Sequence, residues 1–236
     1  MPTKHLELLQ TVASGLSDLT RQTIFVGGAV LDLYITDLAA PEYRPTSDID
    51  CMLHIPALLD MFQWEQLLSD RGFEKVGVAG QPSPHWKYQG IPLTISPMQW
   101  QIELMGFQNR WYEEGVFHAR PYSLSNGHSI RLFPPAYYVA AKIDAFQNRG
   151  KEDFRRSEDF QDLVFLIENR PELPSEIERA FHEVRTYIRT QFRRFLAYPE
   201  LEEGLYYALP FGADEEHIDK IQNIMREIAA GEQMLV

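Results

Sequence analysis

Hydrophobic residues in the first third of the chain follow two different periods. Between residues 4 and 19 they recur every three to four positions, which predicts an amphipathic helix. The run "TIFV" then reaches Gly27 and Gly28, and helical spacing resumes after these glycines, which predicts a strand, a tight turn and a helix. The later stretch "SDIDCMLHI" alternates apolar and polar residues, as a strand with one buried face does.

The pattern that follows predicts more sheet. Helical spacing over residues 57–70 places Phe62 on an inward face, and short apolar runs predict strands at "FEKVGV", "IPLTIS" and "WQIELMGF". In "YSLSNGHSIRLF" the Asn126-Gly127 pair lies between two alternating runs, which is the preferred signal for a tight β-hairpin. We therefore expect a sheet with helices packed against it.

Strand signals stop near residue 135. The stretch that begins at Pro135 has helical spacing with proline in the first turn, and a long helix further on is expected to turn Phe181 inward. Helix N-caps are predicted at three polar residues, Ser157, Ser175 and Asp214. The sequence therefore predicts an α+β fold, with a mixed sheet and flanking helices over residues 1–133 and a helical domain over residues 134–236.

Composition adds few constraints. The chain has 236 residues, 44% of them hydrophobic and 24% charged, which is ordinary for a globular protein of one large domain or two small ones. No apolar run is long enough to span a bilayer and the N-terminus lacks a signal-peptide pattern, so we expect a cytoplasmic protein without membrane contact. The single cysteine, Cys51, lies in a predicted strand, where we expect a buried, inert thiol rather than a catalytic one.

Charge narrows the range of partners. A net charge of −12 argues against a protein coated for non-specific nucleic-acid binding, which needs a broad basic surface. Basic residues nevertheless concentrate in residues 142–156 and 185–194, and the second segment holds Arg185, Arg189 and Arg193 along one helical stripe. That stripe is either a solvated flank or an edge that binds an acceptor. Such a distribution suits a protein that meets an anion at one place.

Asp48 and Asp50 open the alternating strand and are the first candidates for chemistry. Residues two apart on a strand point to the same face about 6–7 Å from each other, so both carboxylates can reach one divalent cation or a pair of them. Hard cations such as Mg²⁺ are commonly held by one or two carboxylates together with substrate phosphates. As an isolated motif, such a pair is more often a solvated strand edge or a cap, so its context decides.

Two further features supply that context. Gly27 and Gly28 follow a strand and precede a helix, where glycines let the backbone approach a phosphate and the helix N-terminus supplies amide donors. Glu103 lies in "WQIELMGF", where a carboxylate is costly unless it meets water, a cation or a donor. The alternatives are an ordinary turn and an outward-facing acid. The chain has neither a GxGxxG fingerprint nor a Walker A lysine, so these two phosphate-binding motifs are excluded.

Together these features resemble the nucleotidyltransferase superfamily with the DNA polymerase β-like fold, and within it the AbiEii/AbiGii-type proteins, many of them toxins of toxin–antitoxin pairs. Three stretches carry the resemblance, "FVGGAVLDLY", "RPTSDIDCML" and "AAKIDAFQNRGKEDFRRSEDFQDLVFLI", and it spans about residues 24–167. It implies a nucleotidyltransferase-like sheet in which Asp48, Asp50 and Glu103 are catalytic residues that hold Mg²⁺ or Mn²⁺. It also implies a set of nucleotide-binding residues: Gly27, Gly28, Arg44, Ser47, Lys142, Asp159 and Asp162.

Some positions also fit simpler interpretations or depart from the family pattern. Lys142 fits a solvated lysine equally well, and Asp159 fits an acid that favours the first turn of a helix. Nineteen residues, 29–47, separate Gly28 from Asp48, which is more than in compact versions of the motif, so residues 40–45 are expected to bulge outward. The third acid is a glutamate where aspartate is commoner.

The resemblance implies transfer of a nucleoside monophosphate from an NTP to a hydroxyl acceptor, such as the end of tRNA or another RNA, a protein, or a small molecule of the aminoglycoside type. An antitoxin is then an expected partner. Two other classes stay open. One is a nucleotide-binding regulatory module with the same fold and no turnover. The other is a metal-dependent phosphatase or glycosyltransferase, although Cys51-Met52 lacks the hydroxyl residue that haloacid-dehalogenase phosphatases carry after the second aspartate.

Overall fold

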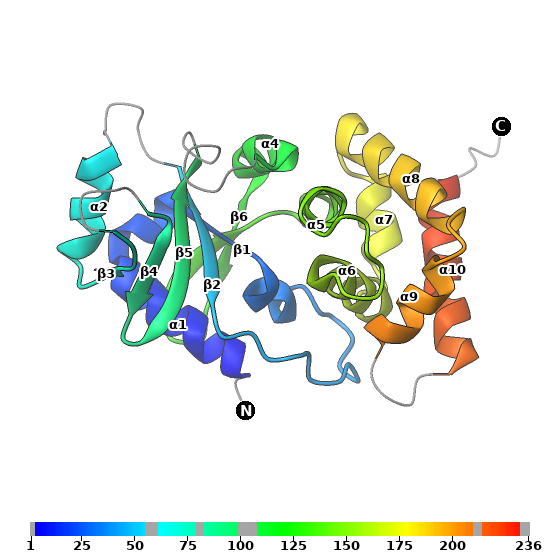
Figure 1. The fold of residues 1–236 in the computed structure, drawn as a ribbon, viewed down its shortest axis with the longest axis horizontal. Helices are drawn as coiled ribbons and strands as arrows, with labels where there is room; N and C mark the ends of the chain where they lie inside the picture. The colour runs from blue at the N-terminus through cyan, green and yellow to red at the C-terminus, as the bar shows by residue number, and fades with distance from the viewer. Residues whose placement is uncertain (1–2, 55–60, 79–82, 99–107, 210–213, 232–236) are drawn as a thin grey trace. The chain divides into compact units, whose positions relative to one another are not determined.

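The computed structural model describes residues 3–54, 61–78, 83–98, 108–209 and 214–231, and within it the chain divides into two compact units (Figure 1). Unit 1 comprises Met1–Leu33, Arg44–Gln108 and Tyr112–Pro134. Unit 2 comprises Tyr34–Tyr43, Asn109–Trp111 and Pro135–Val236. The segment Tyr34–Tyr43, which leads to the aspartate pair in sequence, therefore belongs to the helical unit. The division into separately folding domains after residue 133 stays a prediction.

Unit 1 is built on a mixed seven-stranded sheet with the strand order β3-β4-β5-β2-β1-β7-β6. The inner strand β1 pairs antiparallel with β2 and parallel with β7, and the central strand β2 pairs parallel with β5. The strands of this unit are β1 (Thr23–Val26), β2 (Ile49–Leu53), β3 (Glu74–Lys75), β4 (His85–Tyr88), β5 (Ile91–Pro97), β6 (Arg120–Ser123) and β7 (Ser129–Leu132). Its helices are α1 (Lys4–Leu16), the 3₁₀ helices η1 (Ser17–Gln22) and η2 (Gly28–Leu33), α2 (Met61–Ser69) and most of α4 (Arg110–His118).

The middle of this sheet forms the core of unit 1. All four residues of β1 are buried, and so are Ile49, Cys51 and Leu53 of β2, as the alternating pattern predicts. Met52 is buried as well, so this part of β2 is covered on both faces. The mixed α+β fold class predicted from the sequence is confirmed.

Several local predictions in unit 1 are confirmed and two are wrong. The hairpin is present as β6 and β7, with Asn126 and Gly127 in the turn between them. Phe62, expected inside, is 59% exposed, because the larger apolar side chain of Trp64 on the opposite face of α2 packs into the core against Trp86. The predicted strand "WQIELMGF" lies outside the described residues, and β4 and α4 were not predicted.

The second correction concerns the turn at Gly28, where the predicted helix is present as a six-residue 3₁₀ helix. The chain leaves this helix because the next segment is held elsewhere. The backbone amides of Thr36 and Asp37 both donate to the carbonyl of Asn169, at 3.3 and 3.1 Å. Tertiary hydrogen bonds thus override the helical spacing of "AVLDLY".

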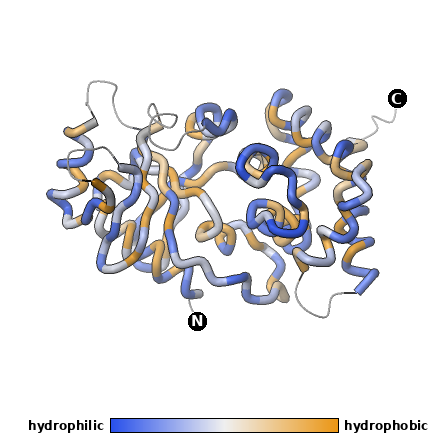
Figure 2. Tube along the Cα trace, viewed as in Figure 1, coloured by the Kyte–Doolittle hydropathy of each residue, from blue (hydrophilic) through white to orange (hydrophobic). Residues whose placement is uncertain are grey.

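Unit 2 is a bundle of helices around α5, whose residues 136–146 are all buried. Figure 2 shows how hydrophobic and hydrophilic residues alternate along α8 and α10, which pack against each other through their apolar faces. The helices of this unit are α5 (Pro135–Asn148), α6 (Glu158–Asn169), α7 (Leu173–Glu178), α8 (His182–Leu196), α9 (Leu201–Ala208) and α10 (Glu215–Ala230). No helix among the described residues is long and apolar enough to cross a membrane.

Two of the three predicted N-caps in unit 2 are confirmed. The side chains of Ser157 and Asp214 each accept a hydrogen bond, 3.3 Å long, from the amide three residues later. Ser175 is not a cap, because it lies inside α7 and its hydroxyl donates to the carbonyl of Glu172. The expected long helix is divided into α7 and α8, and Phe181 takes an extended backbone at the start of α8 that leaves its ring 59% exposed.

Candidate functional site

The glycine turn and the aspartate strand meet inside unit 1. Gly27 follows β1 with a φ of 78°, and Val26 is paired with Asp50 across the β1–β2 ladder. A Cβ at Gly27 would collide with Oδ2 of Asp50 and would lie 3.1 Å from its Cβ and Cγ. Both the backbone conformation and the close approach therefore require glycine here. The Gly27 turn and the Asp50 carboxylate are therefore packed directly against each other.

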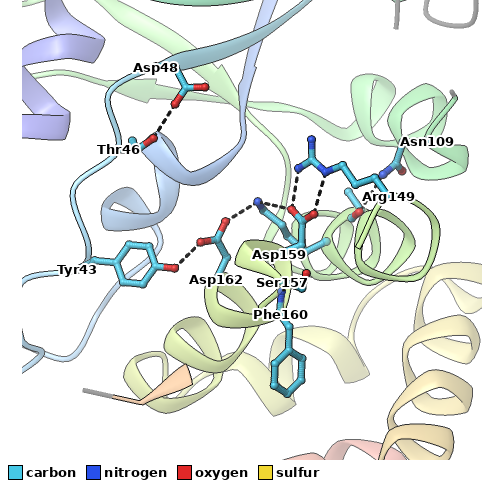
Figure 3. Close-up of polar contacts among 11 residues, drawn as sticks. Tyr43, Thr46, Asp48, Asn109, Arg149, Ser157, Asp159, Phe160 and Asp162 are labelled. Carbon is cyan, nitrogen blue, oxygen red and sulfur yellow. Dashed lines mark hydrogen bonds and ion pairs between the residues drawn. The ribbon is translucent and has the colours of Figure 1, made fainter. Parts of the chain in front are cut away.

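The two aspartates differ in how they are held. Asp50 lies within β2, is half-buried, and has its backbone fixed between β1 and β5. Asp48 precedes the strand, is exposed, and accepts a 2.8 Å hydrogen bond from the Thr46 hydroxyl (Figure 3). On the same loop Arg44 is half-buried and Ser47 is exposed.

The carboxylates of Asp48 and Asp50 are hard oxygen donors of the type that Mg²⁺ and Mn²⁺ prefer. Glu103, the third acid expected at the site, lies outside the described residues. Within the described ranges, no three His, Cys, Asp or Glu residues gather closely enough to hold a metal ion. The donor set therefore fits a cation that is completed by water and substrate oxygens, since such ions keep several non-protein ligands.

Cys51 lies next to Asp50, and its thiol is buried. Its side chain is 2% exposed, and burial together with the neighbouring Asp50 carboxylate raises the pKa of the thiol well above its usual value. A protonated buried thiol is a poor nucleophile and a poor metal ligand. The expectation of a buried cysteine is confirmed.

Unit 2 brings together the later candidates, on α5 and α6. Lys142 is only 6% exposed, and its ammonium donates to Oδ1 of Asp159 at 2.9 Å and forms an ion pair with Oδ2 of Asp162. Figure 3 labels these two aspartates. Asp159 and Asp162 are 4% and 0% exposed. Lys142 is therefore not the solvated lysine that its sequence context also allowed.

Two residues outside the predicted set complete this cluster. Arg149 reaches Asp159 with two parallel hydrogen bonds of 2.9 Å, from Nε to Oδ2 and from Nη2 to Oδ1. The hydroxyl of Tyr43 donates to Oδ1 of Asp162, and its ring packs on Phe165 with centroids 4.3 Å apart. Arg149 was visible in the sequence as part of a basic segment, whereas no local signal marks Tyr43, which lies 119 residues from Asp162.

The opposite charges in this cluster shift the pKa values of Asp159 and Lys142. Burial acts to raise the pKa of Asp159, but Lys142 and Arg149 outweigh it and bring that pKa down to about 2. Burial likewise acts to lower the pKa of Lys142, but the carboxylates of Asp162 and Asp159 raise it above its usual value. Two basic and two acidic side chains thus form one cluster, in which the Arg149 side chain is 53% exposed and the other three are nearly buried.

Several arginines in the basic segments of unit 2 are engaged by protein groups. Arg185 and Arg189 both bind the carboxylate of Glu178, and Arg193 donates to the carbonyl of Ala229 at 2.6 Å. Arg155 and Arg194 pair with other carboxylates of the same unit. The arginine stripe therefore ties α8 to its neighbours rather than forming a solvated flank.

Comparison with known families places the whole chain in one group. A family model described as "Nucleotidyl transferase AbiEii toxin, Type IV TA system" matches residues 9–233. No curated protein sequence matches the chain significantly. Since the family match covers nearly the full length, the chain belongs to the AbiEii family of nucleotidyl transferase toxins from type IV toxin–antitoxin systems.

Proposed function

We propose that this member of the AbiEii family is a metal-dependent enzyme that transfers a nucleoside monophosphate from an NTP to a hydroxyl group. In this reaction the acceptor oxygen forms a bond to the α-phosphorus. The bond from that phosphorus to the oxygen that bridges to the β-phosphate breaks, and pyrophosphate leaves with both electrons of that bond. The hydroxyl proton passes to a carboxylate, for which Glu103 is our proposal from the sequence.

One observation carries this proposal: the carboxylate of Asp50 packs directly on the Gly27 turn. A glycine turn lets a phosphate approach the backbone, and an adjacent carboxylate can hold the cation that accompanies the phosphate. Asp48, two residues earlier, adds a second oxygen donor. Gly28, Arg44 and Ser47 are proposed to line the same pocket.

Asp48 and Asp50, with Glu103, are proposed to hold Mg²⁺ or Mn²⁺. When bound, such an ion neutralises charge that develops on the phosphate oxygens during transfer. Asp48 and Asp50 would keep the ion at a fixed position beside the Gly27 turn, because β2 lies in the middle of the sheet.

In unit 2, we propose that Arg149 contacts a nucleotide phosphate and that Lys142 acts mainly by holding Asp159 and Asp162. The Arg149 side chain is 53% exposed while its guanidinium is oriented by Asp159, whereas the Lys142 side chain is 8% exposed and engaged by two carboxylates. A fixed, partly exposed guanidinium suits phosphate binding. This division would be tested by NTP affinity, which we expect to fall in Arg149→Gln and to stay unchanged in the exposed Arg156→Gln.

For the acceptor we propose an RNA end, and for the partner an antitoxin. The family description names a toxin–antitoxin system, which supports an antitoxin as a partner. A net charge of −12 and the pairing of the unit 2 arginines favour a short acceptor contact over a broad nucleic-acid surface. Growth arrest on expression, relieved by a co-expressed neighbouring gene, would support the antitoxin.

The decisive experiment incubates the full chain with each labelled NTP, Mg²⁺ or Mn²⁺, and total tRNA. We expect label on RNA with the wild type, loss of label in Asp48→Asn and Asp50→Asn, and normal label in Asp219→Asn, whose side chain lies on the exposed face of α10. If the label appears on protein or on small hydroxyl compounds instead of RNA, the proposed acceptor is wrong but the proposed nucleotidyl transfer stands.

A second candidate is a nucleotide-binding module without turnover. The observation that favours it is the neutral, self-paired state of the Lys142 cluster, which resembles a structural ion-pair network. NTP binding by the wild type without transfer to RNA, protein or small hydroxyl acceptors would establish this module and overturn the enzyme.

A further inference from the structure

A buried histidine in unit 1 is linked to the candidate metal ligand Asp48 through Thr46. His5 lies on α1 and is 3% exposed. Its Nδ1 lies 3.0 Å from Oδ2 of Asp32, and its Nε2 lies 2.9 Å from the backbone nitrogen of Thr46. The hydroxyl of Thr46 in turn donates to Oδ1 of Asp48 at 2.8 Å. Four residues from α1, η2 and the loop before β2 thus form one continuous chain.

The hydrogen bonds in this chain determine the tautomer of His5. A backbone N–H can only donate, so Nε2 must be the unprotonated acceptor and the ring proton must lie on Nδ1, where it faces Asp32. Burial acts to raise the pKa of Asp32, but hydrogen bonds from His5 and Thr3 outweigh it, so that pKa lies below its usual value. An ionised Asp32 is the partner that favours a proton on Nδ1.

Asp48 needs such support more than Asp50 does. Asp50 is held by the backbone ladders of β1 and β5, whereas residues 44–48 have no regular secondary structure. Thr46 is held at its amide by His5 and uses its hydroxyl on Asp48, so the orientation of the Asp48 carboxylate depends on this chain. A carboxylate that accepts one hydrogen bond still has lone pairs for a cation.

We propose that His5, in its Nδ1–H form, is a positioning residue that acts through Thr46 to aim Asp48 at a divalent cation. The inference rests on the proposed function, which makes Asp48 a metal ligand. Hydrogen-bonded groups behind metal ligands typically contribute about 10–100-fold to metal affinity. The same contribution is expected here, without any direct contact between His5 and the ion.

The test measures binding of Mn²⁺ to the full chain by electron paramagnetic resonance, without nucleotide. Thr46→Val removes the hydroxyl and is expected to weaken Mn²⁺ binding about 10–100-fold, whereas Thr46→Ser keeps the hydroxyl and should restore most of the affinity. The exposed Thr190→Val on α8 is the matched control and should bind as the wild type does. Urea unfolding of each variant separates lost binding from lost folding.

A second pair of variants tests the histidine itself. His5→Gln can place an oxygen near the position of Nε2 and accept from Thr46, whereas His5→Asn reaches only the position of Nδ1. We expect weaker Mn²⁺ binding in His5→Asn than in His5→Gln. Nitrogen-15 chemical shifts of the imidazole in the wild type should show the proton on Nδ1.

The outcomes distinguish this inference from the proposed function. If Asp48→Asn no longer binds Mn²⁺ but Thr46→Val and His5→Asn bind it as the wild type does, the positioning role of His5 is wrong and the metal site at Asp48 stands. If Asp48→Asn binds Mn²⁺ normally, the metal assignment is wrong and the positioning role falls with it. A proton found on Nε2 also overturns the inference, because the Thr46 amide would then lack its acceptor.

Discussion

The chain carries two pairs of neighbouring aspartates in opposite surroundings. Asp48 and Asp50 lie two residues apart at the start of β2, where Asp48 is exposed and Asp50 is half-buried. Asp159 and Asp162 lie three residues apart on α6 and are 4% and 0% exposed. Taking a carboxylate out of water costs several kcal/mol unless charge or hydrogen bonds compensate. The pair on α6 therefore has to be compensated from within the fold.

Lys142, Arg149 and Tyr43 provide that compensation for the pair on α6. Asp48 is exposed and Asp50 is half-buried, and in the proposed function this pair binds a cation from solution. The difference teaches that two closely spaced pairs of acids can differ sharply in burial, and that the buried pair needs compensation from other residues of the fold. Substitutions in the first pair should then change activity, and substitutions around the second should change stability.

The largest expected loss of stability follows from Lys142→Met. It leaves the buried carboxylates of Asp159 and Asp162 without their shared cation, and breaking a buried ion pair from one side costs about 3–5 kcal/mol. Urea unfolding measures this loss, with the exposed Lys151→Met as the matched control. A loss below about 1 kcal/mol, the range of exposed ion pairs, would show that Lys142 does not stabilise the cluster.

A smaller loss is expected for Tyr43→Phe, which removes only the hydroxyl that donates to Asp162 and keeps the ring on Phe165. Hydrogen bonds to charged groups contribute about 1.5–3 kcal/mol. The same unfolding assay measures it, and Tyr206→Phe, at a residue 64% exposed, is the control. Equal stability of the two variants would mean that the segment Tyr34–Tyr43 does not support α6 through this bond.

Acid should remove the contribution of Asp159. Because its pKa in the folded chain is about 2, below its usual value of 3.8, its charge stabilises the fold above pH 4 and loses this effect as the pH falls toward 2. The shift corresponds to a contribution on the order of 2 kcal/mol. The difference in unfolding free energy between wild type and Asp159→Asn should therefore shrink from pH 5 to pH 2. A difference that is independent of pH would contradict this account.

The two aspartate pairs also differ in how far the sequence could reveal them. Asp48 and Asp50 are recognisable because a strand has a local period of two, and Gly27 because a turn after a strand needs a positive φ. The same local logic predicted the caps at Ser157 and Asp214. Each of these features depends on residues a few positions apart.

The missed features depend on contacts between residues far apart in sequence. Lys142 meets Asp159 and Asp162 only because α5 packs on α6, and neither Tyr43 nor His5 carries a local mark of its partner. The division between α7 and α8 is similar, because both helices have apolar faces that fit one long amphipathic pattern. Periodicity therefore predicted many of the helices and strands, but not β4, α4 or which charges would be buried together.

The smallest effect on stability is expected where the effect on activity is greatest. Asp48→Asn changes an exposed side chain, so the free energy of unfolding should move by less than about 0.5 kcal/mol. Transfer of label from NTP should nevertheless fall by roughly a hundredfold or more, as when other groups that stabilise charge in a site are removed. Unfolding and transfer are measured on the same preparation, with Lys142→Met beside it. If Asp48→Asn loses stability and keeps transfer, Asp48 belongs with the structural carboxylates of α6, and the distinction between the two pairs fails.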